Sequence, residues 1–301
     1  MYVITGATGN TGHIVAKRLL ENGKQVRVIG RNAEKLATLA SAGAEPFVGD
    51  LGDQEAMSRA FSGAQAAYVM IPPNITSSDA PAYQNKISDA ISAAIEKNEV
   101  RHVVALSSIG ADKAEKTGPI VGLHRLEERL RRIAGLSTLA IRAAYFMENT
   151  LPQVSVIQHM GVTAGPLQPD LKVPMIDTRD IGAFAADALL KVDFKGFQTP
   201  ELLGNRELTY PEVTSIIGNA IGKPDLRYQQ LPYDQFAGAL QQMGMSESVA
   251  NLLAEMSEAL NTGHVRALEP RSARNTTPTS FETFVAEEFV PAYQGKSLQV
   301  A

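Results

Sequence analysis

Three glycines at intervals of three residues stand near the start of the chain, where they could form a phosphate-binding turn. They follow an apolar run, Tyr2–Thr5, and open an amphipathic one, Gly12–Asn22. In such a turn the first glycine permits the bend, the second lets the backbone approach a pyrophosphate, and the third permits close helix–strand packing. The helix N-terminus then presents free N–H groups to the phosphates. We therefore predict a dinucleotide site formed by Gly6, Ala7, Thr8, Gly9, Asn10, Thr11 and Gly12.

The end of the second predicted strand should decide between NAD and NADP. An acidic residue at that point binds the ribose hydroxyls, whereas a basic residue accommodates the 2′-phosphate. The sequence there is Val28-Ile29-Gly30-Arg31-Asn32, with no acidic residue before Glu34. Arg31 offers a planar fork suited to phosphate, and Lys35 adds a charge one turn into the next helix. We expect NADP, as NADPH; the alternative is that Arg31 is a solvated surface residue.

The elements that must position these residues alternate along the first half of the chain. Alternating strands and helices are typical of an α/β fold, a doubly wound Rossmann parallel sheet. Both faces of such a sheet are covered, which explains why its strands are continuously apolar. The predicted strands are Tyr2–Thr5, Val26–Ile29, Pro46–Val48, Ala66–Ile71, Arg101–Ser107 and Thr138–Arg142. The predicted helices are Gly12–Asn22, Ala33–Ala42, Gln54–Phe61, Pro81–Asn98 and Leu123–Ala134.

The pattern changes after about residue 151. Residues 152–175 carry four prolines and little periodicity, whereas 176–196 contain a helix, Asp180–Leu190, that is expected to return to the first domain. We predict a Rossmann domain over 1–151 with 176–196, and a smaller, mainly helical substrate or partner domain over 152–175 and 197–301. Its predicted helices are Tyr210–Ile221, Tyr233–Met243, Ser246–Asn261 and Phe281–Val290, with a loop at Arg271–Thr279.

The composition argues against several function classes. A hydrophobic content of 44% and a charged content of 20% are ordinary for a globular protein. The net charge of −4 favours neither nucleic acid nor an anionic membrane as a partner. No apolar run approaches the roughly 20 residues that cross a bilayer, and the N-terminus does not resemble a secretion signal. The chain has no cysteine, and its five histidines lack metal-ligand spacing, so we expect no metal site and a cytoplasmic protein.

The glycine spacing, in the context TGATG, resembles the short-chain dehydrogenase/reductase superfamily, and the fuller match is to its atypical NmrA-like branch. The resemblance covers nearly the whole chain. The residues that carry it are Thr5–Gly12, Val28–Asn32, Gly49–Leu51, Val104–Gly110, Ile141–Thr150, Val173–Gly182 and Thr277–Val285. It implies an NAD(P)-binding protein: members include NADPH-dependent quinone and triphenylmethane-dye reductases, and redox-sensing regulators that bind a dinucleotide without known catalysis.

The resemblance also implies further cofactor contacts. It places Asp50 and Leu51 beside the adenine, where Asp50 would accept a hydrogen bond from the amino group; alternatively Asp50 belongs to the N-cap region of the next helix. We further expect Met70, Ile71 and Pro72, where the fourth predicted strand ends, to contact the cofactor.

The chain departs from the superfamily at its Tyr-x-x-x-Lys pair, in which the lysine lowers the pKa of the tyrosine so that it can protonate a carbonyl oxygen. The corresponding positions hold Ile120 and His124, and no tyrosine lies between Tyr83 and Tyr145. The usual acid is therefore absent. His124 either hydrogen-bonds the nicotinamide ribose in place of the lysine or pairs on the surface with Glu127 or Glu128.

Two further polar positions are candidates for the site. Ser107 and Ser108 end the fifth predicted strand and either face the nicotinamide or cap the following loop. Tyr145 follows the sixth strand together with Phe146 and Asn149; it either stacks beside the substrate or nicotinamide or lies in a domain interface. The candidate catalytic residues are thus His124, Ser107 and Tyr145, and the same three are expected to contact the cofactor.

Hydride transfer to an acceptor that is already electrophilic requires positioning more than a strong protein acid. The leading hypothesis is an oxidoreductase that transfers a hydride from NADPH to a quinone-like or dye-like acceptor. The alternative is a non-catalytic NADP(H) sensor that acts through a regulatory protein partner. The partner expected in the first case is a small-molecule acceptor, and a homodimer is compatible with both.

Overall fold

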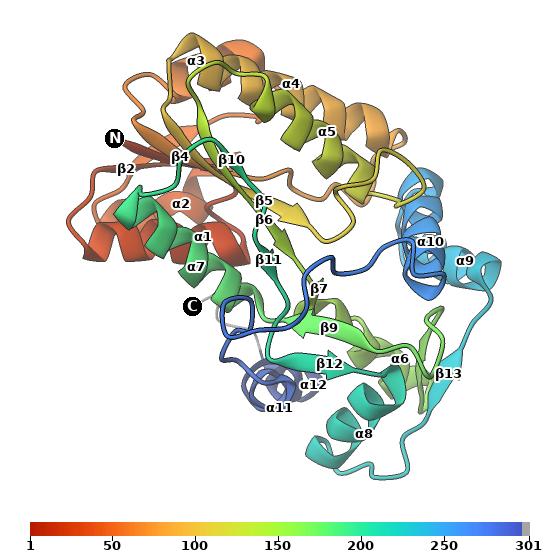
Figure 1. Ribbon diagram of the computed structural model, residues 1–301. Helices are drawn as coiled ribbons and strands as arrows, with labels where there is room; N and C mark the ends of the chain where they lie inside the picture. The colour runs from red at the N-terminus through yellow and green to blue at the C-terminus, as the bar shows by residue number, and fades with distance from the viewer. Residues whose placement is uncertain (297–301) are drawn as a thin grey trace.

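Strand β1 lies near the centre of an eight-stranded sheet in the computed structural model, which describes residues 1–296 (Figure 1). The strand order is β10-β6-β5-β4-β1-β2-β3, and β11 also pairs with β6. All of these pairs are parallel, with Val3 of β1 opposite Arg27 and Ala67. The strands are β1 (Tyr2–Ile4), β2 (Val26–Gly30), β3 (Glu45–Val48), β4 (Ala66–Val69), β5 (His102–Ser108), β6 (Ser137–Ala143), β10 (Phe197–Gln198) and β11 (Glu201–Leu202).

Helices cover both faces of this sheet, which confirms the predicted doubly wound fold (Figure 1). Side chains from α1, α2 and α7 pack with alternate strand residues such as Ile4 and Val28 on one face. Side chains from α3, α4 and α5 pack with the intervening residues such as Val3 and Ile29 on the other. These helices are α1 (Asn10–Glu21), α2 (Ala33–Ser41), α3 (Gln54–Ala60), α4 (Ala80–Lys97), α5 (Ile120–Arg131) and α7 (Thr178–Lys191).

Helix α5 begins three residues before the expected start at Leu123. Pro119 is its N-cap residue, and Gly122 lets it approach α4, since a Cβ there would lie 2.4 Å from Oε1 of Gln84. The earlier start places Ile120 in the first turn, on the same helix as His124.

The smaller part of the molecule contains more strand than the sequence predicts. Residues 152–175, expected to be irregular, contain α6 (Gln153–Met160), β8 (Thr163–Gly165) and part of β9 (Val173–Ile176). Strand β9 pairs with β12 (Arg206–Leu208) and with β7 (Tyr145–Phe146), and β8 pairs with β13 (Tyr228–Gln230). The strands are short and gain their hydrogen bonds from distant segments, so local periodicity did not reveal them.

The expected domain boundary at residue 197 also differs from the structure, because β10 and β11 extend the large sheet beside β6. Residues 297–301 of the expected second domain lie outside the described part of the chain. The remaining helices are α8 (Tyr210–Ala220), α9 (Tyr233–Gln242), α10 (Glu247–Asn261), α11 (Phe281–Phe284) and α12 (Val290–Tyr293), with a π-helical turn, Val285–Phe289, between the last two. The π turn interrupts the single helix expected over Phe281–Val290.

The C-terminal segment returns to the first turn of α7. Asp180 accepts hydrogen bonds from the backbone N–H and the hydroxyl of Thr279, at 3.0 and 2.8 Å. Arg179 forms ion pairs with Glu287 and Glu288 in the π turn. Two of the segments that carry the NmrA-like resemblance, 173–182 and 277–285, are thus held together.

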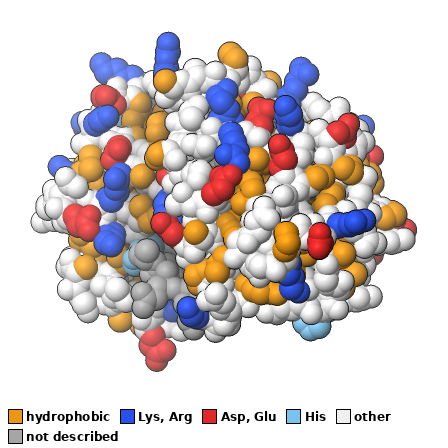
Figure 2. Space-filling view, turned by 90° about the horizontal axis from the view of Figure 1, so that it is seen from below, with side chains coloured by type: hydrophobic (Ala, Val, Ile, Leu, Met, Phe, Trp, Pro, Cys, Tyr) orange, Lys and Arg blue, Asp and Glu red, His pale blue; other side chains and the backbone are white. Residues whose placement is uncertain are grey.

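The surface mixes both signs of charge. In the view from below, lysine and arginine side chains are interspersed with aspartate and glutamate side chains (Figure 2). Among residues 1–296, no helix is long and apolar enough to cross a membrane.

Helices α1 and α7 pack closely at Gly182, so the fold predicts an intolerance of side chains there. A Cβ at this position would lie 2.8 Å from Cβ of Ile14 and 3.0 Å from the carbonyl oxygen of Thr11. We expect Gly182→Ala to lower the free energy of unfolding by about 1–3 kcal/mol through overpacking, measured by denaturant titration.

The matched control is Gly238→Ala in α9, where an added Cβ meets open space. Alanine is the better helix former, so this variant should be neutral or more stable by up to about 1 kcal/mol. Equal losses in the two variants would contradict the proposed packing.

Candidate functional site

The turn after β1 brings the first and last predicted glycines into direct backbone contact. Gly6 has φ +62°, which favours glycine, and a Cβ on Gly12 would lie 2.4 Å from the carbonyl oxygen of Gly6. Helix α1 follows with Gly9 as its N-cap residue, no side-chain cap and no acidic residue in its first turn. Thr8, Gly9 and Asn10 are exposed at this end. The N-terminus of α1 is therefore open to an anionic group, as a dinucleotide pyrophosphate requires.

Ala7, Thr11 and Gly12 face the protein rather than an open space. Ala7 is fully buried, and the hydroxyl of Thr11 accepts a hydrogen bond of 2.8 Å from Tyr68 in β4. The neighbouring Thr5 hydroxyl accepts a bond from the backbone N–H of Met70. These contacts fix the glycine turn to the chain that leaves β4, so their role is to support the site.

A small cavity of about 80 Å³ lies beside the glycine turn and brings together six of the predicted cofactor residues. It is lined by Gly6, Thr8, Ile29, Gly30, Arg31, Gly49, Asp50, Leu51, Pro72, Tyr83 and Ile87. Its position at the ends of β1 and β2 corresponds to the adenosine end of a Rossmann site.

The charged residues predicted at this end differ in placement. Arg31 is exposed and lines the cavity. Lys35 is also exposed but lies outside the residues that line it. Asp50 lines the cavity while its carboxylate accepts a bond of 2.7 Å from the N–H of Gly52, and the N-cap of α3 is Asp53 instead. The adenine contact of Asp50 stays a prediction.

A larger cavity of about 400 Å³ opens where β4, β5 and β6 end. Pro72 and Tyr83 line both cavities, so the two are neighbours. Its walls come from the β4–α4 loop and the start of α4 (Met70, Ile71, Pro72, Pro73, Asn74, Ile75, Ala80, Tyr83 and Gln84), from β5 and α5 (Leu106, Ser107, Ser108, Ile109, Pro119, Ile120 and Leu123), from the segment after β6 (Ala144, Tyr145, Phe146 and Asn149), and from α10 and beyond (Val249, Leu252, Leu253, Met256, Leu260 and Val265). Its volume suits a small ligand.

Ser107 lines this cavity, and its hydroxyl donates a bond of 2.6 Å to Glu127 of α5. Glu127 is 2% exposed and also accepts two bonds from Arg142, of 3.1 and 2.7 Å. The serine proton is therefore committed to a buried carboxylate, and the serine oxygen keeps its lone pairs for a donor in the cavity. Ser108 instead donates to the carbonyl oxygen of Ile109.

His124 lies outside the residues that line either cavity. It is half-buried, and its Nδ1 lies 2.8 Å from the carbonyl oxygen of Ala111 in the loop after β5. Its expected surface partners are engaged elsewhere, since Glu127 pairs with Arg142 and Glu128 with two arginines of its own helix. A contact of His124 with the nicotinamide ribose stays a prediction.

The position of the usual acid is occupied by an apolar wall. Ile120 is 5% exposed and lines the cavity beside Leu123. Tyr145 also lines the cavity; its hydroxyl lies 2.8 Å from that of Tyr210, and burial raises the pKa of both phenols. The polar group that the superfamily uses for protonation is thus missing from α5, while a neutral phenol from the segment after β6 lines the same cavity.

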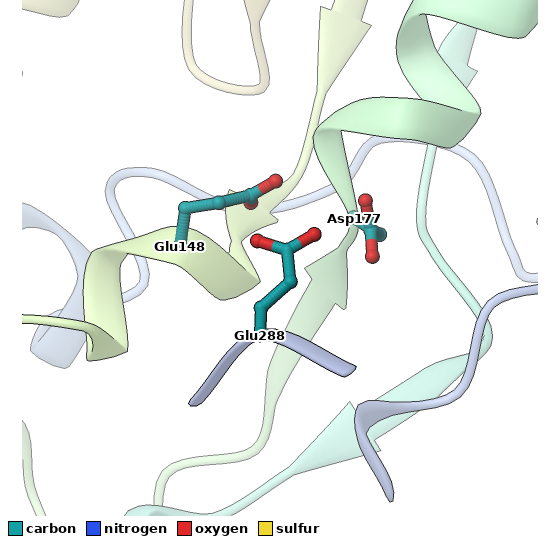
Figure 3. A group of neighbouring side chains, drawn as sticks. All are labelled: Glu148, Asp177 and Glu288. Carbon is teal, nitrogen blue, oxygen red and sulfur yellow. The ribbon is translucent and has the colours of Figure 1, made fainter. Parts of the chain in front are cut away.

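Three carboxyl groups, from the 3-10 helix Met147–Thr150, the N-cap of α7 and the π turn, lie close together (Figure 3). Glu148, Asp177 and Glu288 bring one oxygen each within 4.8 Å of one another. Glu148 accepts bonds from the backbone N–H and the hydroxyl of Thr178, and Asp177 is paired with Arg179 at 3.0 Å. Burial, with the nearby Asp177 charge, raises the pKa of Glu148 to about 7. Burial likewise raises the pKa of Asp177 and of Glu288.

Several lining residues were missed from the sequence. Tyr83 and Gln84 lie in the first turns of α4 and were treated as part of an ordinary helix, while Glu127 was treated as a surface residue. The pattern Leu123, Leu126, Leu130 marks the buried stripe of α5, and Glu127 is adjacent to it, which is the only local indication of burial. The roof of the cavity is α10; the helix predicted at Ser246–Asn261 could either line an apolar pocket or belong to the core, and residues such as Leu252 and Met256 do line the cavity.

The family assignment rests on the whole chain. Residues 2–289 match the NmrA-like family, so the chain belongs to that family. It is 30% identical over 97% of its length to all of a (4-alkanoyl-5-oxo-2,5-dihydrofuran-3-yl)methyl phosphate reductase of Streptomyces griseus. It is 28% identical over 87% of its length to 89% of quinone oxidoreductase 2 of Escherichia coli. The predicted resemblance is confirmed.

A solved structure shows the same fold. The NADPH-dependent quinone oxidoreductase of Escherichia coli, complexed with NADPH, superposes with a TM-score of 0.82. The match covers 96% of this chain and all of that one at 23% identity. At this identity the likeness shows the fold alone.

The carboxyl cluster predicts a pH dependence of stability. The pKa of Glu148 is raised in the folded protein from its ordinary value of 4.5 to about 7, so the folded state binds this proton more tightly than the unfolded state. The contribution of this group to stability is therefore fully present below the ordinary value and is lost as the pH rises through about 7. The Glu148→Gln variant keeps the side-chain shape but cannot ionise. Between about pH 5 and pH 8, we expect its free energy of unfolding to fall by about 1–3 kcal/mol less than that of the wild-type protein, measured by urea titration at each pH. An unchanged pH profile would contradict the raised pKa.

Proposed function

We propose that this member of the NmrA-like family is an NADPH-dependent reductase that transfers a hydride to an uncharged, quinone-like or dye-like electrophilic acceptor. The observation that carries the proposal is the continuity of the two cavities. The cavity beside the glycine turn and the apolar cavity at the ends of β4 to β6 share Pro72 and Tyr83. One elongated ligand could therefore extend from the first into the second, as a dinucleotide would.

The residues at the first cavity fit NADPH. The open N-terminus of α1 suits the pyrophosphate, and Arg31 suits the 2′-phosphate because its guanidinium can bond two oxygens at once. When bound, NADPH would supply the hydride. Ser107 and Tyr145 would contact the nicotinamide end, since both line the larger cavity. His124 lines neither cavity, so it would take part only by hydrogen-bonding the nicotinamide ribose.

The larger cavity favours acceptors that need no strong acid from the protein. Ile120 replaces the usual tyrosine, and α10 covers the cavity with apolar side chains such as Leu252 and Met256. These walls orient an apolar ring and exclude water, which are the contributions that hydride transfer to an electrophilic ring requires.

The named relatives favour catalysis over the alternative of a non-catalytic sensor. The Streptomyces protein is a reductase and the Escherichia coli protein a quinone oxidoreductase. A third relative, 28% identical over 85% of this chain and 86% of its own length, is an NAD(P)H azoreductase of Xenophilus azovorans. A regulatory partner or a homodimer would be compatible with the proposed activity.

The test is the loss of NADPH absorbance with a panel of quinones, azo dyes and triphenylmethane dyes. The cavity lining holds no Lys, Arg, His, Asp or Glu among the described residues. A charge without a counterion in an apolar site is unfavourable by several kcal/mol. We therefore expect a neutral naphthoquinone to exceed its sulfonated derivative in kcat/KM by about a hundredfold or more. Tight NADPH binding without turnover across the panel would instead support the sensor.

The second test concerns the choice of cofactor. We expect Arg31→Ala to weaken NADPH binding about tenfold to a hundredfold, because a charge-assisted bond to phosphate contributes about 1.5–3 kcal/mol, and to leave NADH binding within about threefold. Titration calorimetry with both cofactors measures this. Lys35→Ala is the matched control, since Lys35 is also basic and exposed but does not line the cavity. Unchanged NADPH affinity in Arg31→Ala would contradict the assignment to NADP.

A further inference from the structure

The larger cavity has a pair of phenols at one wall. The hydroxyls of Tyr145 and Tyr210 lie 2.8 Å apart, and their rings meet edge to face at 82°. Tyr210 also packs against Tyr228, whose hydroxyl is bonded to the backbone carbonyl oxygens of Gly165 and Leu167 at 2.8 and 2.7 Å. The positions of all three rings are therefore fixed by contacts behind the cavity wall.

The two facing hydroxyls carry two protons, but they share one hydrogen bond. Among the described residues, neither hydroxyl has a further partner. Tyr210 is 6% exposed and does not line the cavity, whereas Tyr145 does. If Tyr145 donated to Tyr210, the proton of Tyr210 would be buried without an acceptor, which is unfavourable. The favoured arrangement is that Tyr210 donates to Tyr145, which leaves the Tyr145 proton available to the cavity.

This proton stays on Tyr145 at neutral pH. Burial raises the pKa of Tyr145 and, more strongly, that of Tyr210, so neither phenol ionises. Tyr145 is therefore a hydrogen-bond donor rather than a base. Two other polar side chains at the cavity already donate hydrogen bonds to protein groups: Ser107 donates to Glu127, and Gln84 donates to the carbonyl oxygen of Pro119.

We propose that the Tyr145 hydroxyl, oriented by Tyr210, donates a hydrogen bond to the carbonyl oxygen of the acceptor, and that the preferred acceptor is consequently an uncharged carbonyl compound of the quinone type. The inference rests on the proposed function. It gives the site a hydrogen-bond donor from the segment after β6, in a cavity where Ile120 occupies the position of the superfamily's usual acid.

The chemistry balances with NADPH as the reductant. The hydride from NADPH would form an O–H bond at one quinone oxygen, the ring π electrons would rearrange to the aromatic hydroquinone monoanion with its charge on the other oxygen, and NADPH would become NADP⁺. The resulting oxyanion takes a proton from solvent to give the hydroquinone. Tyr145 stabilises the charge that develops on this oxygen without losing its own proton. Such a donor acts in the transition state, where the oxygen is more negative than in the ground state.

The test compares Tyr145→Phe with two matched variants, each of which removes one hydroxyl from the same cluster. Tyr145→Phe should lower kcat/KM for a neutral naphthoquinone by about tenfold to a hundredfold. Tyr210→Phe, which removes only the orienting bond, should give a smaller loss. The hydroxyl of Tyr228 bonds backbone carbonyl oxygens and does not line the cavity. Tyr228→Phe should therefore lower stability and leave kcat/KM within about threefold of the wild-type value.

A second readout does not depend on turnover. The infrared carbonyl band of an isotopically labelled quinone, bound with NADP⁺, should lie at lower frequency in the wild-type protein and in Tyr228→Phe than in Tyr145→Phe. If Tyr145→Phe changes neither kcat/KM nor the carbonyl band, the proposal is overturned. If the band shifts as expected but neither the wild-type protein nor any variant reduces a quinone, the hydrogen bond from Tyr145 is supported and the proposed reductase function is contradicted.

Discussion

The site depends on one close backbone contact, between the carbonyl oxygen of Gly6 and the α-carbon of Gly12. A side chain at position 12 would lie 2.4 Å from that oxygen, so glycine alone permits the approach. The contact holds the start of α1 against the end of β1 and leaves the N-terminus of α1 exposed where the carboxyl ends of the central strands lie. There the strand order reverses between β1 and β4, which is where open α/β sheets bind their ligands. Gly182 in α7 extends the same close packing to the helix beside α1.

The charges near the site are arranged so that the acceptor cavity contains none of them. Glu127 lies directly behind Ser107, but Arg142 neutralises it through two hydrogen bonds. Glu148 lies in the chain between Phe146 and Asn149, which line the cavity. Its carboxyl group instead accepts hydrogen bonds from Thr178 and lies near Asp177 and Glu288 (Figure 3). For Glu127 the pairing with Arg142 offsets the desolvation penalty of burial, whereas for Glu148 this penalty appears as a raised pKa. The result is a cavity whose polar groups are hydroxyls and amides, while these carboxyl groups lie behind its walls.

Sequence patterns predicted the parts of the molecule that depend on local physics. The glycine turn, the strand–helix alternation and Arg31 each follow from residue types within a few positions, and the structure places Gly6, Thr8, Arg31 and Asp50 around one cavity. The parts that failed depend on distant partners. Strands β10 and β11 have two residues each and exist because β6 offers an edge. Glu127 is buried because Arg142, on another element, faces it.

The two ends of the site are built by different parts of the chain. The cavity beside the glycine turn is lined only by residues between 6 and 87, whereas the roof of the larger cavity comes from residues 249–265. The cofactor end is constrained by backbone geometry, since it depends on turns and a helix terminus that few sequences can form. The larger cavity depends on side-chain size and polarity on α10, which is held to the large sheet's loops by hydrogen bonds such as those of Ser248 with the N–H of Ala80 and Glu255 with the N–H of Gly118. Because α10 contributes no residue to the cavity beside the glycine turn, its side chains shape the larger cavity independently of the turn that faces the dinucleotide.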